Sequence, residues 1–254
     1  MSRPDRKATL DRQQAAVAAG GLKAMMPVGR PFLDYVLTML ADAGFEEICL
    51  VIGPDRGAIR DYYQQDAIPR RFKLSFAHQE KPLGTADAVL AAEAFAGNDR
   101  FLVVNSDTYY PVQACRSLHL LGEAGLAAFW RETLIAEGNL SAERVARFPV
   151  VEMDGQGFLT HLLEPEDAPV PPEGADVLVS MNCWMFTPSI FRACRAIGPS
   201  PSGELELPEA VRHAVAKLGE RLRVLPIREP VLDLTSRADV ASVAARLADV
   251  GVRL

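Results

Sequence analysis

Cysteine pairs and long hydrophobic runs are missing from this sequence. No apolar stretch among its 254 residues approaches the roughly 20 that cross a bilayer, and the N-terminus lacks the apolar core of a signal peptide. The cysteines have no C-x-x-C spacing, so neither a zinc site nor a disulfide framework is indicated; they are Cys49, Cys115, Cys183 and Cys194. These absences predict a cytoplasmic protein with reduced, buried thiols and no membrane partner.

Positive charge and histidine are also scarce. The chain has 27 lysines and arginines against 33 aspartates and glutamates, for a net charge of -6. Because no basic stripe is present to neutralise phosphates, nucleic acid is excluded as a partner. An anionic substrate would need a metal ion or a few well-placed lysines. The spacing of the four histidines suggests neither a Ser/His/Asp nor a Cys/His arrangement, which disfavours a hydrolase.

The hydrophobic residues, 49% of the chain, change periodicity repeatedly from residue 31. Residues 31–44 place apolar side chains on one helical stripe, with Pro31 in the first turn and Gly44 as the stop. Short apolar runs then alternate with helical patterns, which predicts a parallel sheet with crossover helices. The strands are expected at 46–53, 72–79 and 100–107, and the helices between them at 55–65 and 84–95.

The second half of the sequence predicts a mixed sheet that extends the α/β core. Residues 164–176 are acidic and rich in proline, which indicates a surface loop or lid, with a solvated connector as the simpler interpretation. Strands are expected at 125–133, 146–154, 157–165, 175–186 and 221–227, and helices at 188–197, 204–219 and 236–250.

Asp107 follows the apolar strand at 100–107. Open α/β sheets hold ligands at the carboxyl ends of their parallel strands, and a carboxylate there suits Mg²⁺, which takes one or two carboxylates plus substrate phosphates. A cap on the next helix explains a lone aspartate equally well. Asp233 follows another strand-like run and is either a second metal ligand or a turn residue, with Thr235 or Ser236 as a helix cap.

Two further segments carry groups that could meet a nucleotide. Gln79 has an amide that can donate and accept hydrogen bonds at once, which suits a nucleobase edge. Gly84 allows a close backbone approach, and the helix start at Thr85 offers free N–H groups, although such a start is more often only a cap. Lys23 lies in a loop and is either solvated or a point charge for phosphate.

Taken in order, these motifs resemble the sugar-phosphate nucleotidyltransferase family across nearly the whole chain. They are Lys-x-x-x-Pro-Val-Gly-x-Pro from Lys23, Gln-x-x-Pro-Leu-Gly-Thr-Ala from Gln79, Ser-Asp at Asp107, an asparagine followed shortly by a phenylalanine, and Asp-x-Thr from Asp233. The resemblance implies Mg²⁺-dependent transfer of a nucleotidyl group from a nucleoside triphosphate to a sugar 1-phosphate, giving a nucleotide sugar and pyrophosphate.

The resemblance also implies a fold. We expect an α/β protein with a Rossmann-like, doubly wound mixed sheet, three α/β/α layers and a β-rich sugar-binding extension. The single domain 1–254 would comprise a nucleotide-binding half at 1–124, a sugar-binding half at 125–235 and a C-terminal helix at 236–254. A homo-oligomer is compatible with this family.

The roles that the resemblance implies fall on matching positions. Gln79, Gly84 and Thr85 match the segment that contacts the nucleotide, and Asp107 and Asp233 match the two Mg²⁺ ligands. Lys23 matches a catalytic lysine, and Glu164 and Asn182 match the residues that hold the sugar. Two positions depart from the family pattern: Ala24 replaces a proline, and Pro165 stands where a lysine grips the sugar phosphate.

The start of the sequence departs further. Family members open with a strand and a glycine-rich L-A-A-G-x-G-T-R loop that cradles the triphosphate, and this sequence has no counterpart. We expect that Met1 is an internal methionine and that the protein begins roughly twenty residues upstream with the central strand. The alternative is a chain that is short, poorly stable and inactive.

Two other function classes compete with this interpretation. A non-catalytic sensor or regulatory subunit that binds a nucleotide or nucleotide sugar is favoured by the missing loop and the missing lysine. Asp107 and Asp233 count against it, because a pure binder has less need of two metal carboxylates. A dinucleotide-dependent oxidoreductase is disfavoured because no G-x-G-x-x-G follows a first strand.

Overall fold

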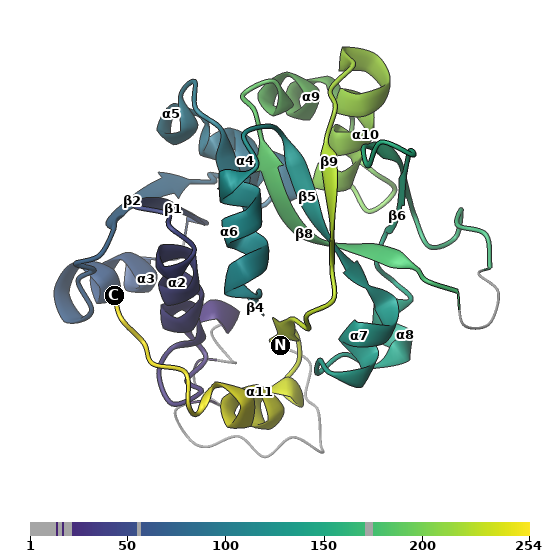
Figure 1. The fold of residues 1–254 in the computed structure, drawn as a ribbon. Coiled ribbons are helices and arrows are strands. Elements are labelled where there is room, and N and C mark those ends of the chain that lie inside the picture. Colours follow the sequence, from purple (N-terminus) through teal and green to yellow (C-terminus); the bar gives the residue numbers. More distant parts are fainter. Residues whose placement is uncertain (1–13, 15–16, 18–21, 55–56, 171–174) are drawn as a thin grey trace.

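The computed structural model describes residues 14, 17, 22–54, 57–170 and 175–254 (Figure 1). The chain forms a mixed α/β structure in which helices cover strands from both sides, and this confirms the predicted fold class. No helix of the described part is long and apolar enough to cross a membrane.

The predicted alternation of helix and strand is confirmed in the first half. The helix α2 (Phe32–Asp42) follows Pro31 and ends shortly before Gly44, whose φ of +105° suits glycine. The strands β1 (Glu47–Ile52) and β2 (Lys73–His78) pair in parallel, in register from Glu47 opposite Lys73. The remaining elements are η1 (Lys23–Met25), α3 (Gly57–Asp61) with a π-helical turn η2 (Tyr62–Asp66), α4 (Thr85–Ala91), α5 (Glu93–Ala96) and β3 (Phe101–Val103).

The second half contains the expected strands and three helices that the sequence pattern did not reveal. These are α6 (Val112–Leu120), α7 (Arg131–Ala136) and α8 (Ala142–Val145), of which α7 begins inside a predicted strand. The other elements are β4 (Thr108–Tyr109), β5 (Gly125–Trp130), β6 (Val150–Met153), β7 (Leu159–Leu163), β8 (Leu178–Phe186), α9 (Ile190–Ala196), α10 (Leu207–Leu218), β9 (Arg223–Ile227), β10 (Leu232–Asp233) and α11 (Asp239–Leu247).

The long strand β8 organises the main sheet, whose order is β7-β6-β8-β5-β9. One edge of β8 pairs antiparallel with β5, and its last residues pair antiparallel with β3 along Phe101 to Val103. Within the described residues, β1 and β2 form a separate two-stranded pair, and β4 and β10 form another. The strands therefore fall into three hydrogen-bonded groups.

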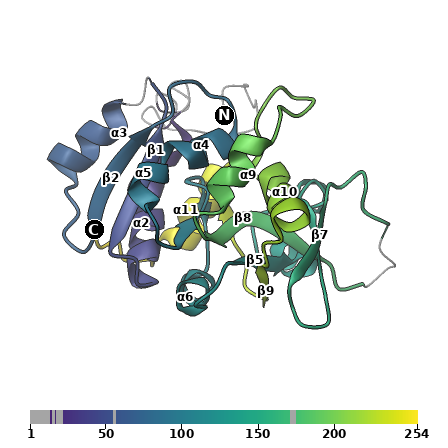
Figure 2. The same ribbon diagram turned by 90° about the horizontal axis from the view of Figure 1, so that it is seen from above.

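Alternate residues of β8 point to opposite faces and join two different cores. Cys183 and Met185 pack in the core with α2, α6 and α11, whereas Trp184 and Phe186 pack in the core with α4, α9 and α10. Figure 2 shows α4, α9 and α10 on one side of the strands and α2 and α6 on the other. This layering leaves the ends of the strands free to carry functional side chains.

Candidate active site

Pairing of two short strands brings together the two predicted metal ligands. Asp107 directly precedes β4, and Asp233 is the last residue of β10. In this antiparallel pair Asp233 lies opposite Thr108, and the Leu234 amide donates to the Asp107 carbonyl at 2.8 Å. Asp107 and Asp233, which are 126 positions apart in the sequence, thus become neighbours.

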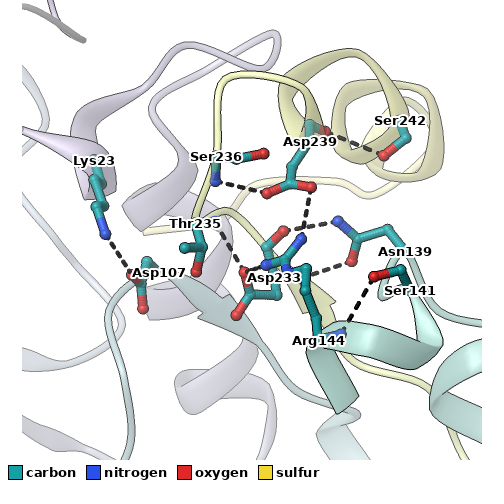
Figure 3. A network of polar contacts seen from close by, with 10 residues as sticks. All are labelled: Lys23, Asp107, Asn139, Ser141, Arg144, Asp233, Thr235, Ser236, Asp239 and Ser242. Carbon is teal, nitrogen blue, oxygen red and sulfur yellow. Dashed lines mark hydrogen bonds and ion pairs between the residues drawn. The ribbon is translucent and has the colours of Figure 1, made fainter. Parts of the chain in front are cut away.

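Lys23 comes from a third segment, the short helix η1. Its Nζ lies 3.8 Å from Oδ2 of Asp107, and the two side chains are 36% and 27% exposed, so both reach solvent (Figure 3). Burial, followed by the charge of Asp233, raises the pKa of the Asp107 carboxyl, and Lys23 partly offsets this. The predicted trio is therefore assembled as two carboxylates and one ammonium group.

The backbone of Asp233 is held by Asn139. The Asn139 side chain donates to the Asp233 carbonyl at 2.7 Å and accepts from the Asp233 amide at 2.9 Å. These two bonds satisfy the backbone N–H and C=O of Asp233, as a neighbouring strand would. The Thr235 amide then donates to Oδ1 of Asp233 at 2.9 Å, which fixes the carboxylate as an Asx turn would.

Arg144 is the central residue of this network, and the sequence analysis did not identify it. It lies on α8, where the Ser141 hydroxyl caps the helix by accepting from the Arg144 amide. Its guanidinium donates to Oδ1 of Asp233 and, at 2.8 Å, to Oδ1 of Asp239 (Figure 3). Both carboxylates are buried, with 7% of each residue exposed. Arg144 therefore balances two buried charges at once.

The oxygens that remain can be tested against a hard metal ion. Oδ2 of Asp233 accepts no hydrogen bond from the described residues, and the Asp107 carboxylate accepts none from another described side chain. No group of three or more His, Cys, Asp or Glu residues with metal-site geometry occurs in the described part. Two carboxylates fit Mg²⁺, which usually completes its shell with water and substrate phosphate, and do not form an all-protein cage.

Gln79 lies just after β2 and uses its amide within the protein. Its Nε2 donates to the Gly84 carbonyl and to Oδ2 of Asp87, both at 2.9 Å. These bonds tie the loop 79–84 to the first turn of α4. The Oε1 atom has no partner among the described residues, so half of the amide remains available to a ligand.

Gly84 and Thr85 contact the segment before α10. Gly84 has a φ of +116°, and a Cβ there would lie 2.5 Å from the Leu205 carbonyl oxygen, so backbone packing within the protein already requires glycine. The Thr85 hydroxyl accepts from the Leu207 amide at 2.8 Å. This contact satisfies one of the free amides at the start of α10.

Asn182 lies at a β-bulge in β8. The pairing with β5 skips from Trp184 opposite Leu126 to Ser180 opposite Ala128. Asn182 has a φ of +57°, a left-handed conformation that asparagine tolerates. Its Oδ1 accepts from the Trp184 indole at 3.3 Å. The bulge therefore places the polar side chain of Asn182 in a mostly apolar strand.

Tyr110 supports this bulge from below, and sequence reasoning missed it. It is fully buried, and its hydroxyl donates to the Met181 carbonyl at 2.6 Å. Burial raises the pKa of the Tyr110 hydroxyl well above its usual range, so the group stays a neutral donor. A single tyrosine between β4 and α6 gives no sequence signal for this role.

Glu164 is separated from Asn182. It follows β7 and accepts from Nη1 of Arg212 at 2.8 Å, and Arg212 also contacts Glu209 at 2.6 Å. Glu164 and Arg212 line a cavity of about 890 Å³, whereas Asn182 lines a different one of about 640 Å³. The guanidinium of Arg212 places a cation beside Glu164, where the sequence has Pro165 in place of a lysine.

Curated proteins with similar sequences are sugar nucleotidyltransferases. The chain is 23% identical over 225 residues to the UTP–glucose-1-phosphate uridylyltransferase YngB of Bacillus subtilis, covering 80% of this chain and 75% of YngB. It is 29% identical over 191 residues to AglF of Haloferax volcanii, also a UTP–glucose-1-phosphate uridylyltransferase. The match covers 74% of this chain and 73% of AglF. A glucose-1-phosphate thymidylyltransferase of Streptomyces antibioticus is 29% identical over 189 residues, which cover 73% of this chain and 49% of that enzyme.

Solved structures show the same fold at lower identity. A UDP-glucose pyrophosphorylase complexed with UDP-glucose superimposes with a TM-score of 0.69 at 19% identity, covering 89% of this chain and 90% of that one. A UTP-bound enzyme from Acinetobacter baumannii superimposes with a TM-score of 0.68 at 18% identity. The superposition covers 91% of this chain and 87% of that one. The family model for nucleotidyl transferases matches residues 19–229. The chain therefore belongs to the nucleotidyl transferase family and is a nucleotidyltransferase.

Proposed function

We propose that this nucleotidyltransferase transfers a uridylyl group from UTP to glucose 1-phosphate, giving UDP-glucose and pyrophosphate. Relatives that use UTP and glucose 1-phosphate support the choice of substrates, and a thymidylyltransferase relative makes dTTP the first alternative. The observation that carries the proposal is the meeting of Asp107 and Asp233 beside Lys23.

The reaction needs no covalent intermediate with the protein. A phosphate oxygen of the sugar 1-phosphate attacks the α-phosphorus in line, the new P–O bond forms, and the bond from the α-phosphorus to the bridging oxygen breaks as pyrophosphate leaves. Catalysis is then positioning and charge neutralisation. Lys23 supplies a point charge for the phosphates, and its contact with Asp107 keeps the ammonium group beside the two carboxylates.

Asp107 and Asp233 would hold a divalent cation, which we take to be Mg²⁺. The ion would supply charge neutralisation for the phosphates when bound. Arg144 acts here as a positioning residue, because it occupies Oδ1 of Asp233 and leaves Oδ2 for the ion. Lys23, Asp107 and Asp233 thus form the proposed catalytic set.

The remaining predicted residues have supporting roles in this proposal. Gln79 keeps Oε1 free for a nucleobase donor, and the loop at Gly84 and Thr85 shapes the base pocket through its packing on Leu205. We assign Glu164 to the sugar, with Arg212 as the cation that accompanies it. Asn182 lines the other cavity, so contact of the same sugar with Asn182 would require the two residues to move together.

The test is release of pyrophosphate from a panel of nucleoside triphosphates and sugar 1-phosphates in the presence of Mg²⁺. The 254-residue chain is compared with a form extended upstream in frame, and an Asp107→Asn variant of each serves as the control. We expect UTP with glucose 1-phosphate to give the highest rate, and the control to lose it. Nucleotide binding without pyrophosphate release in either form would reject the enzyme and support a regulatory binder.

A further inference from the structure

Arg131, the first residue of α7, has a side chain that makes no hydrogen bond or ion pair with the described residues. Its Nε atom is buried and has no acceptor. The main-chain N–H of Arg131 is satisfied, because it donates to the Val177 carbonyl at 2.9 Å. Only the guanidinium is therefore left without a partner, and a buried donor without an acceptor destabilises a folded protein.

The other unpartnered cations of the described part differ from Arg131 in exposure. Folded proteins pair buried charges and leave unpaired lysines and arginines at the surface, where water solvates them. The exposed lysines and arginines that have no side-chain partner in the described ranges are Arg70, Lys81, Arg100, Arg192 and Lys217. Arg131 is half-buried and still unpaired. This combination indicates that its partner is a molecule other than the chain itself.

The topology of the sheet places Arg131 at the edge that carries the candidate active site. β3 and β5 both pair antiparallel with β8, so they run in the same direction, and β9 runs parallel to β5. The carboxyl ends of these strands share one edge, where open α/β sheets hold ligands. Asp107 follows β3 and Arg131 follows β5, whereas Arg228 follows β9 and lies 3.8 Å from Asp176. Figure 1 shows β4 and α7 at the same end of the strands.

The segment that begins at Arg131 also holds Asp233. Asn139 follows α7 and binds the backbone of Asp233, and Arg144 of α8 binds its carboxylate. α7 itself packs against β5 and α8. The free guanidinium and the two residues that position a proposed metal ligand thus belong to one short segment, 131–145.

Arg212, the cation beside Glu164, lacks the free charge of Arg131. Its guanidinium donates to Glu164 at 2.8 Å and to Glu209 at 2.6 Å, so two carboxylates balance one positive charge. Arg144 is held between two carboxylates in the same way. Arg131 therefore offers an anionic ligand a charge that no carboxylate of the described residues already neutralises.

A phosphate group matches this arrangement. The planar fork of a guanidinium presents parallel N–H donors to two phosphate oxygens, and such a contact would give Nε the acceptor that it lacks. We propose that Arg131 is a phosphate-binding residue that holds a phosphate group of a bound substrate. The role deepens the proposed function and rests on it for the identity of the compound, which is the sugar 1-phosphate or the nucleoside triphosphate.

The first test is urea unfolding of the ligand-free 254-residue chain. Arg131→Met keeps the apolar stem of the side chain and removes the charge. We expect a higher midpoint than in the parent, because a half-buried charge without a partner is lost. Arg192→Met, which removes an exposed and unpartnered charge, is the control and should leave the midpoint unchanged. A lower midpoint in Arg131→Met would show that the guanidinium stabilises the protein itself, and would overturn the proposal.

The second test is isothermal titration of the same proteins with inorganic phosphate, glucose 1-phosphate and UTP at constant ionic strength. We expect Arg131→Met to bind at least one of these probes about tenfold more weakly than the parent, and Arg192→Met to bind like the parent. Arg131→Lys keeps the charge without the fork and should recover part of the loss. A loss confined to glucose 1-phosphate identifies the sugar phosphate as the occupant, and a loss confined to UTP identifies the triphosphate.

Parental affinity for all three probes in Arg131→Met would overturn the proposal, as would a parent that binds none of them. Neither test depends on catalysis, so the two proposals fail separately. Pyrophosphate release together with parental binding in Arg131→Met would reject the role of Arg131 alone. Weaker binding in Arg131→Met without pyrophosphate release by the parent would reject the reaction and leave a phosphate-binding protein.

Discussion

Two regions carry the residues that sequence reasoning selected, and they differ in what their polar groups contact. At the Asp107–Asp233 pair, carboxylate oxygens remain without hydrogen-bond donors and face the Lys23 ammonium. In the loop from Gln79 to Thr85, the two polar side chains selected from the sequence already bind the protein: the amide nitrogen of Gln79 donates to Gly84 and Asp87, and the Thr85 hydroxyl accepts from the Leu207 amide.

The difference shows that a motif residue can serve a ligand only with the atoms that folding leaves free. The aspartates keep such atoms because Arg144 and Asn139 hold Asp233 from the other side. In the loop, mainly the backbone and the Oε1 atom of Gln79 remain available to a ligand. Substitutions in the first region should therefore affect charge balance and catalysis, and substitutions in the loop should affect mainly stability.

Replacing Arg144 gives the largest expected effect. Arg144→Met removes the partner of two buried carboxylates, Asp233 and Asp239, and leaves both uncompensated. Breaking a buried pair in this way costs about 3 kcal/mol of unfolding free energy. Urea unfolding followed by circular dichroism measures the loss.

The matched control for Arg144 is its neighbour Arg147. Arg147 pairs with Glu143, and the two side chains are 72% and 80% exposed. Because an exposed ion pair contributes well under about 1 kcal/mol, Arg147→Met should leave the midpoint of urea unfolding nearly unchanged. Equal losses from the two substitutions would contradict the role assigned to Arg144.

Replacing Asp107 should lower activity by at least about 100-fold, equivalent to about 2.7 kcal/mol. Asp107→Asn keeps the size of the side chain but removes the charge that pairs with Lys23 and would hold the cation. Pyrophosphate release measures the loss, and Asp154→Asn, in an exposed turn, should retain parental activity. A parental rate in Asp107→Asn would remove this residue from the catalytic set.

The stability of Asp107→Asn relative to the parent protein should depend on pH. Burial raises the pKa of Asp107 above its ordinary value of 3.8, so its contribution to stability is present below that value and is lost as pH rises through the raised pKa. Asp107→Asn should therefore be more stable than the parent at pH 7, with a difference that shrinks below pH 4. Thermal unfolding at several pH values checks this, and a constant difference would be inconsistent with the raised pKa.

Sequence reasoning selected the two aspartates because each follows an apolar, strand-like run. It could not identify Arg144, because its contacts with Asp233 and Asp239 join residues that are 89 and 95 positions apart. The short helices α7 and α8, which carry Arg144 into place, were missed for a related reason. They are four to six residues long, too short for a helical period to stand out from the preceding strand.

Gly84→Ala should cost about 2 kcal/mol of stability through strain and collision. Its Cβ would lie 2.5 Å from the Leu205 carbonyl oxygen, and its φ of +116° is unfavourable for alanine. Gly122→Ala is the control, because Gly122 has a φ of +80° but no atom within 4 Å of the added Cβ. The difference between the two variants in urea unfolding isolates the collision, and a difference of zero would show that the loop moves away freely.

Thr85→Val has the smallest expected effect and separates the two regions most directly. The change removes the acceptor for the Leu207 amide at the start of α10, which costs about 1 kcal/mol of stability. Because the hydroxyl is occupied by this cap, the KM for the nucleotide should stay at the parental value. Thr85→Ser keeps an acceptor and should restore most of the lost stability. A raised KM in Thr85→Val at unchanged stability would instead place the hydroxyl on the nucleotide, and the loop would then share the ligand-binding role of the aspartates.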